Sequence, residues 1–208
     1  MHIADGILPL SVSLSGYALT AAGLAFSLRR LDARTMPQLA VVTSGFFVAS
    51  LIHLPLGPTS VHLLLPGLVG ALLGRSAFLS IVIGLFLQSM LFQFGGLTAL
   101  GANSLMMGLP ALLCGWLFQR FQGHTRTSRT VAGTLVGALG VLMAAIFLAF
   151  FLMLSGEAFH TVAKLALAAH VPVMVIEGLV TGSAIAFLHR VKPELLNNPF
   201  TKPETKAP

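Results

Sequence analysis

The feature that most constrains this chain is a series of long apolar segments separated by short polar or basic stretches. We distinguish about seven of them, at residues 8–28, 38–54, 61–74, 76–92, 103–118, 131–154 and 170–188. An apolar segment of about 20 residues is long enough to cross a bilayer as a helix. Because a helix satisfies its backbone hydrogen bonds internally, the sequence predicts an all-α integral membrane protein with about seven transmembrane helices.

Composition supports this class. Charged residues make up 9% of the 208 residues, against about 25% in soluble domains. The net charge of +6 comes from Lys and Arg clustered between the apolar segments, a pattern typical of membrane orientation and not of nucleic-acid binding. We therefore expect one polytopic membrane domain over residues 1–190, in contact with the lipid bilayer. Residues 191–208 are expected to form a flexible cytoplasmic tail.

The basic residues also predict an orientation. If the N-terminus lies outside and seven crossings alternate, Lys164 is the one Lys or Arg left on the outer side. The others then face the cytoplasm, as the positive-inside rule requires: Arg29, Arg30, Arg34, Arg75, Arg120, Arg126, Arg129, Arg190, Lys192, Lys202 and Lys206. This orientation predicts a multi-pass protein of the cell inner (plasma) membrane with a cytoplasmic C-terminus. It places residue 2 and the loops at 57–60 and 95–101 on the outer side.

The first two residues offer three nitrogen donors. These are the α-amine of Met1, the backbone nitrogen of His2 and the His2 imidazole. Together they can close two fused chelate rings around one cation, and such donors suit Ni, Cu, Co and Zn better than Mg or Ca. A histidine this close to a terminus is more often an ordinary polar residue. Removal of a signal peptide would destroy the chelate, but Asp5 and the lack of Lys or Arg before Leu8 argue against such a peptide.

The third apolar segment is too short for a full crossing. Its roughly 14 residues span about 21 Å as a helix, against a hydrocarbon core of about 30 Å. Pro55, Gly57 and Pro58 prevent a backward extension of the helix. We expect the chain to dip into the outer half of the membrane, and a short helix to begin near Val61 with His62 on its first turn. His62 is then either a metal ligand or a residue hydrogen-bonded to the loop, and spacing alone does not decide.

Two polar side chains lie in the last apolar segment. An unpaired charged side chain at the bilayer centre costs about 2.5–3.5 kcal/mol on insertion scales, so Glu177 should face the interior and be hydrogen-bonded. His170 lies seven residues earlier, on the same helix face. Both could serve ion movement, although a structural hydrogen bond is the more common role. Methionines such as Met106 could suggest a thioether site, but methionine in an apolar helix usually fills space.

Three separated motifs resemble one known family. They are Met1-His2-Ile3-x-x-Gly6, the segment PLGPTSVHLL at 55–64 and the segment GGLTALGAN at 95–103. In this order they resemble the CbiM/NikM family, the substrate-binding S components of energy-coupling-factor (ECF) transporters for cobalt and nickel. The resemblance extends over about residues 1–190. It implies that the metal is held by the Met1 amine, the His2 backbone nitrogen and the imidazoles of His2 and His62, and that an added first helix delivers the N-terminus into the core.

The loop before His62 departs from the family's pattern. Residues 57–62 read Gly-Pro-Thr-Ser-Val-His, where many members read Gly-Gly-Thr-Ser-Gly-His. We interpret this as a subfamily difference that could alter metal preference. Further residues could orient the ligands through hydrogen bonds, with Asn103 first because it lies in the third motif: His53, Ser60, Gln93 and Asn103.

The sequence leaves three function classes to compare. The favoured one is the S component of an ECF-type ABC importer, which captures Ni²⁺ or Co²⁺ outside the cell as transported substrate and needs no cofactor. The chain contains no Gly-x-x-x-x-Gly-Lys-Ser/Thr motif, so we expect a transmembrane coupling (T) component, separate ATPase subunits and, as a further potential partner, a small accessory membrane subunit. The second class, an intramembrane enzyme, is disfavoured because His-Glu-x-x-His and Gly-x-Ser-x-Gly are also missing. The third is a proton-coupled secondary divalent-metal carrier that uses Glu177 and His170.

Overall fold

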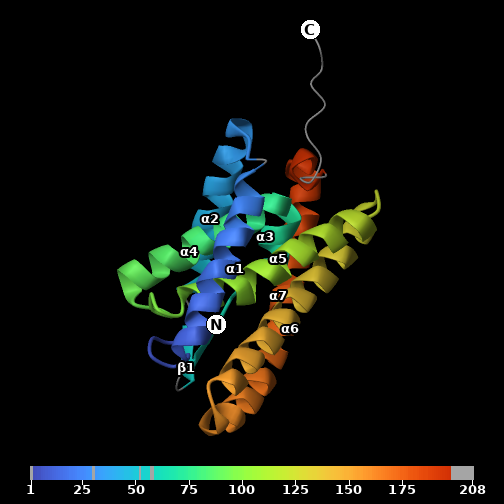
Figure 1. Cartoon of the computed structure of the whole chain (residues 1–208). Coiled ribbons are helices and arrows are strands. Elements are labelled where there is room, and N and C mark those ends of the chain that lie inside the picture. Colours follow the sequence, from blue (N-terminus) through green and yellow to red (C-terminus); the bar gives the residue numbers. More distant parts are fainter. Residues whose placement is uncertain (1, 30, 52, 57–58, 198–208) are drawn as a thin grey trace.

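The computed structural model describes residues 2–29, 31–51, 53–56 and 59–197, and for 53–56 and 59–61 it describes the backbone alone. Figure 1 shows a bundle of helices that pack at different angles, with one short hairpin. The helices are α1 (Leu10–Leu28), α2 (Met36–Ser50), α3 (Pro66–Leu73), α4 (Ala77–Phe92), α5 (Leu100–Phe121), α6 (Arg126–Leu154) and α7 (His160–Val191). The hairpin consists of β1 (His53–Leu56) and β2 (Thr59–His62).

Five stretches of the described chain are long and apolar enough to cross a membrane as helices. They are Leu10–Leu28, Pro66–Phe92, Leu100–Phe121, Arg126–Leu154 and Glu157–Val191. The helical class is therefore confirmed, and the five stretches are consistent with a membrane protein. Helix α2 has 15 residues and α3 has 8, too few to cross alone, and Gly74 at φ 54° separates α3 from α4. Seven complete crossings and their orientation stay predictions.

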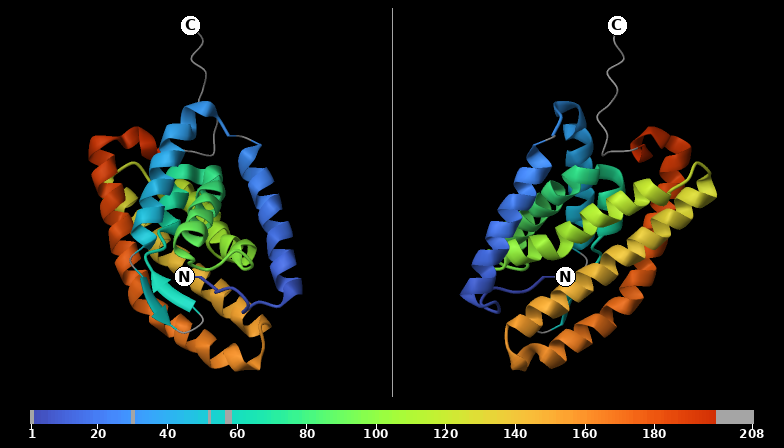
Figure 2. Two further views of the ribbon diagram at one scale, coloured as in Figure 1. Left: turned by 90° about the vertical axis from the view of Figure 1, so that its left-hand side faces the viewer. Right: turned by 45° about the vertical axis from the view of Figure 1, so that its right-hand side comes forward.

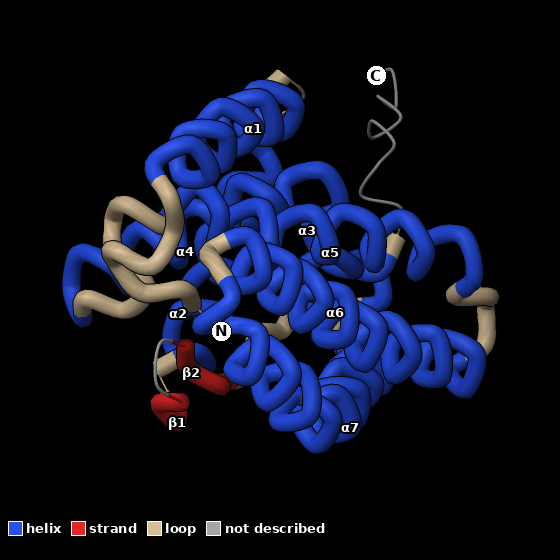
Figure 3. Tube along the Cα trace, turned by 60° about the horizontal axis from the view of Figure 1, so that its bottom comes forward, coloured by secondary structure: helices blue, strands red, loops and turns tan. Residues whose placement is uncertain are grey.

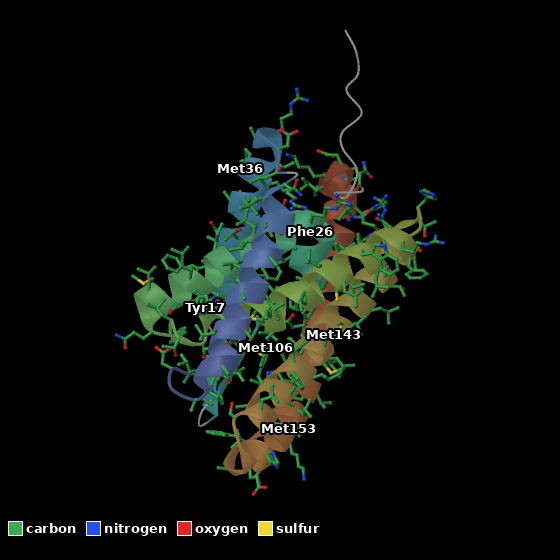
Figure 4. All side chains as sticks on the ribbon, in the orientation of Figure 1. Tyr17, Phe26, Met36, Met106, Met143 and Met153 are labelled. Atoms are coloured by element: carbon green, nitrogen blue, oxygen red, sulfur yellow. The ribbon has the colours of Figure 1, made fainter. Side chains whose placement is uncertain are left out.

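Basic residues gather at one end of the bundle. Successive helices run in opposite directions, so that α1, α5 and α7 all end near the top of Figure 1. Arg29 caps α1, Arg75 lies between α3 and α4, and Arg120 and Arg190 lie in the last turns of α5 and α7. Figure 4 shows many nitrogen-tipped side chains at this end. The distribution is the one that the positive-inside rule predicts for a cytoplasmic end.

Helix α3 packs between α5 and α6. Of its eight residues, all but Leu68 are buried. A Cβ atom on Gly70 would collide with the Ala111 carbonyl of α5, and one on Gly67 would collide with the backbone of Gly137 in α6. Contacts of this kind bring helix backbones together without intervening side chains, which is how helices associate tightly in lipid.

The segment between α2 and α3 differs from our prediction. It forms an antiparallel hairpin in which His53 pairs with His62, so His62 ends a strand instead of lying on the first turn of a helix. The prediction of a helix that begins near Val61 is wrong. Leu65 adopts a left-handed conformation (φ 49°), and α3 begins only at Pro66. Proline suits this first position because its φ is already helical and it needs no backbone donor there.

Candidate metal centre

The N-terminal segment is held by one side chain of α5. Ile3 is fully buried, and its N–H donates to Oδ1 of Asn103 at 2.9 Å. Its carbonyl accepts from Nδ2 of the same Asn103 at 3.1 Å. The carboxamide therefore satisfies both backbone groups of Ile3, as a neighbouring strand would. Since Asn103 lies in the first turn of α5, this pair of bonds fixes the position of the adjoining His2 against a helix.

The loop between α4 and α5 leaves room for this segment. Gly95 and Gly96 adopt left-handed conformations, with φ 78° and 69°. A Cβ atom on Gly95 would come within 2.9 Å of Cβ of His2, and one on Gly96 would collide with the Asp5 carboxylate. Oδ1 of Asp5 also accepts from the backbone N–H of Thr98 at 2.8 Å and from its hydroxyl at 2.6 Å. Only glycine combines this backbone conformation with so close an approach.

The imidazoles of His2 and His62 lie together. Both side chains are 4% exposed, and their rings stack with centroids 4.6 Å apart and planes inclined by 20°. Nδ1 of His62 lies 2.8 Å from the Leu63 carbonyl, and because a carbonyl only accepts, Nδ1 carries the proton. The Nε2 lone pair of His62 is then free, and within the described residues this buried atom has no hydrogen-bond partner. Burial lowers the pKa of His62 to about 4, so the ring is neutral, the form that binds metals.

The spacing of the two rings is compatible with two ligands of one metal ion. Metal–imidazole bonds are about 2.0–2.1 Å long, so two nitrogens on one cation lie within about 4 Å of each other. Rings with centroids 4.6 Å apart can therefore turn toward a single cation. Among the described residues no three His, Cys, Asp or Glu side chains form a ready cluster, so a complete site needs backbone or terminal nitrogens as well. Met1 lies outside the described residues, and its role stays a prediction.

The other predicted supporting residues are placed less fully. His53 lies opposite His62 in the hairpin, but its side chain and that of Ser60 lie outside what the structure describes. Gln93 is exposed and ends α4 in a left-handed conformation, with φ 57°. Of the two candidates whose side chains are described, Gln93 and Asn103, it is Asn103 that the structure shows hydrogen-bonded to the N-terminal segment.

The methionines labelled in Figure 4 are spread along the length of the bundle. Met36 lies toward the upper end of the bundle, Met153 toward its lower end and Met106 between them. Met106 is fully buried, as expected for a side chain that fills space in a core.

Glu177 of α7 binds the backbone next to His62. The Leu65 N–H donates to its two carboxylate oxygens at 2.8 and 2.9 Å, and the Leu64 N–H donates to Oε1 as well. Glu177 is fully buried, so the prediction of an interior, hydrogen-bonded carboxyl is confirmed. The sequence did not reveal its partners, which are backbone amides immediately before the first residue of α3.

Comparison with known proteins supports this picture. The family model CbiM, described as a cobalt uptake substrate-specific transmembrane region, matches residues 2–195. A putative metal transport protein of Haemophilus influenzae is 36% identical over 95% of this chain and 97% of its own length. A cobalt transport protein CbiM of Sorangium cellulosum is 30% identical over 95% of both chains. A putative fused nickel transport protein NikMN of Archaeoglobus fulgidus is 31% identical over 94% of this chain and 68% of its own length.

Solved structures share the fold. A crystal structure of a transition metal transporter superimposes with a TM-score of 0.73 and 23% identity over 92% of this chain and 93% of that one. The long apolar helices, the buried imidazole pair and these relatives define a multi-pass membrane component of a metal transport system. The chain belongs to the CbiM family, which confirms the resemblance inferred from its three motifs.

Proposed function

We propose that this chain is the substrate-capture S component of an ECF-type ABC importer. In this proposal it binds Ni²⁺ or Co²⁺ on the outer side of the membrane through nitrogens of Met1, His2 and His62, and the metal is cargo. The observation that carries the proposal is the buried, stacked pair of His2 and His62, because Nε2 of His62 points a lone pair into the protein with no hydrogen-bond partner among the described residues. The two hydrogen bonds between the Asn103 side chain and the backbone of Ile3 support the proposal, because they fix the neighbouring His2 beside His62.

The proposed donor set favours particular metals. Two adjacent fused chelate rings from Met1 and His2 are nearly flat, so that a fourth nitrogen from His62 completes a set close to one plane. This geometry suits Ni²⁺ and Cu²⁺ and disfavours Zn²⁺, which prefers a tetrahedron. Relatives named as cobalt and as nickel transport proteins support both cations as substrates. We favour nickel slightly on geometric grounds.

Energy for transport is proposed to come from other subunits. Because the sequence lacks a phosphate-binding loop motif, ATP would be hydrolysed by ATPase subunits that act through a T component. The alternative, a proton-coupled carrier, has weaker support because the carboxylate of Glu177 is already occupied by the amides of Leu64 and Leu65. Metal uptake by the assembled complex in vesicles should require ATP. Uptake driven by a proton gradient alone would favour the carrier.

Calorimetry on the full-length protein tests the site. His62→Ala should abolish high-affinity Ni²⁺ and Co²⁺ binding, whereas His124→Ala, an exposed histidine of the loop between α5 and α6, should leave binding unchanged. Acetylation of the Met1 amine should also abolish capture, because it removes one nitrogen ligand and leaves both histidines in place. Binding by His62→Ala as tight as that of the wild type would refute the assignment.

A further inference from the structure

A hollow of about 390 Å³ opens on the outside of the bundle between α1 and α5. Figures 2 and 3 show α1 at the edge of the bundle, on the side away from α7. The α5 residues that line the hollow are spaced i, i+3, i+4 and i+7, so they share one helix face: Leu109, Leu112, Leu113 and Trp116. All but Leu112 are exposed. In a bilayer this mainly apolar wall, about 10 Å long from Leu109 to Trp116, faces acyl chains.

One charged side chain lines this hollow. Arg75 is half-buried, and its guanidinium lies over the ring of Phe26, 5.6 Å from the ring centroid. Its backbone carbonyl accepts from the Ser27 hydroxyl at 2.7 Å, which places it beside the last turn of α1. Among the described residues no carboxylate pairs with this guanidinium. Arg75 also lies within Pro66–Phe92, a stretch apolar enough to cross a membrane. A charged side chain in such a stretch is costly without a partner, so we expect an anion from outside the chain beside it.

The hollow reaches the level at which lipid headgroups are expected. Phe26 lies toward the upper end of α1 in Figure 4, the end at which the basic residues gather. Trp116 lies one turn before Arg120, which is in the last turn of α5, and tryptophan is enriched at the membrane–water interface. Basic pockets between transmembrane helices on the cytoplasmic side bind anionic lipid headgroups. A cation, an interfacial tryptophan and an apolar helix face are thus combined in one hollow.

We propose that this hollow binds an anionic phospholipid. The lipid phosphate lies on the guanidinium of Arg75, whose planar fork can donate two parallel N–H bonds to one phosphate. One acyl chain lies along the face of α5 formed by residues 109–116. In phosphatidylcholine the lipid's own ammonium group competes with Arg75 for the phosphate, whereas phosphatidylglycerol carries no such group. The hollow therefore favours the anionic lipid, and this inference does not depend on metal capture.

Tryptophan fluorescence tests this proposal, because Trp116 is the only tryptophan in the chain. The full-length protein is reconstituted into phosphatidylcholine bilayers that contain phosphatidylglycerol, and one or the other lipid carries brominated acyl chains, which quench tryptophan. Phosphatidylglycerol should occupy the hollow with a roughly fivefold preference, the effect of one cation beside an anionic headgroup. Arg75→Gln should abolish this preference. Arg190→Gln is the matched control, because Arg190 is exposed in the last turn of α7 at the same end of the bundle, and it should keep the preference.

Four results would overturn the proposal. The first is equal quenching by the two lipids in the wild type, and the second is a preference that survives Arg75→Gln or is lost equally in Arg190→Gln. The third is loss of the preference when inorganic phosphate is added at constant ionic strength, because the hollow would then bind free phosphate. The fourth is quenching by neither lipid, which would indicate that a protein covers the hollow. If Arg75→Gln does not fold, the wild-type comparison and the phosphate competition still decide.

Discussion

Asn103→Ala should weaken metal binding without touching a metal ligand. The substitution removes both partners of Ile3, whose N–H and carbonyl are bound at 2.9 and 3.1 Å in a fully buried position. A buried backbone group without a partner costs about 1–3 kcal/mol, so two of them disfavour the docked N-terminal segment by at least about 2 kcal/mol. Because capture requires the docked segment, we expect a roughly 30-fold loss of Ni²⁺ affinity, at about 1.4 kcal/mol per tenfold change.

Isothermal titration of the purified full-length protein measures this loss. Ser104→Ala is the matched control: Ser104 is the next residue of α5, is fully buried, and its hydroxyl has no hydrogen-bond partner among the described residues. Its affinity should therefore equal that of the wild type. If Asn103→Ala folds normally and binds Ni²⁺ as tightly as Ser104→Ala, the hydrogen bonds between Asn103 and Ile3 do not hold His2 in the site, and the reasoning fails.

Four further predictions follow from the same geometry. Gly96→Ala should weaken Ni²⁺ binding measured by calorimetry, because the new Cβ would collide with the Asp5 carboxylate at a left-handed position; equal affinity would contradict this. Glu177→Ala should lower the free energy of unfolding by at least about 2 kcal/mol, since two buried amides lose their acceptor, and thermal unfolding would reveal it. Metal-free protein should lose stability as pH falls from about 6.5 toward 4: the folded-state pKa of His62 is lowered to about 4, so the unfolded state takes up the proton first; stability that is constant over this range would refute the shift. A cysteine at Ser155 should react with an impermeant thiol reagent added outside cells, and one at Thr125 should not; the reverse labelling would invert the orientation.

Helix positions could be predicted from the sequence better than helix lengths. Apolar runs predicted helical segments at 131–154 and 170–188, whereas the helices cover Arg126–Leu154 and His160–Val191. The first turn of α6 is basic and polar, and the Thr125 side chain caps it by accepting from Ser128 N–H. An apolar run marks contact with lipid or core, but backbone hydrogen bonding continues through polar residues beyond it. Helix ends in this chain are therefore set by caps and turns.

Site residues whose side chains carry donor or amide groups could be predicted from the sequence. Contacts made by backbone amides could not. Nitrogen donors in His2 and His62 were evident, as was an amide in Asn103. The partners of Glu177 were not, because backbone amides carry no sequence signature and 112 residues separate Leu65 from Glu177. The same contact explains the error at Val61: with Leu64 and Leu65 donating to Glu177, the chain stays non-helical until Pro66.

The packing of α3 between α5 and α6 means that His2 and His62 are held in different ways. Gly67 and Gly70 put the α3 backbone in direct contact with its neighbours, and the chain that leads from His62 into this helix is tied to α7 through Glu177. His62 therefore belongs to a framework that can shift only if three helices shift together. The segment that carries His2 lies outside these helices and is held by the hydrogen bonds of Asn103 and Asp5, by burial of Ile3 and by the stacking of His2 on His62. If the chain captures a cation as proposed, we expect its release to begin with withdrawal of the N-terminal segment, while the imidazole of His62 keeps its place.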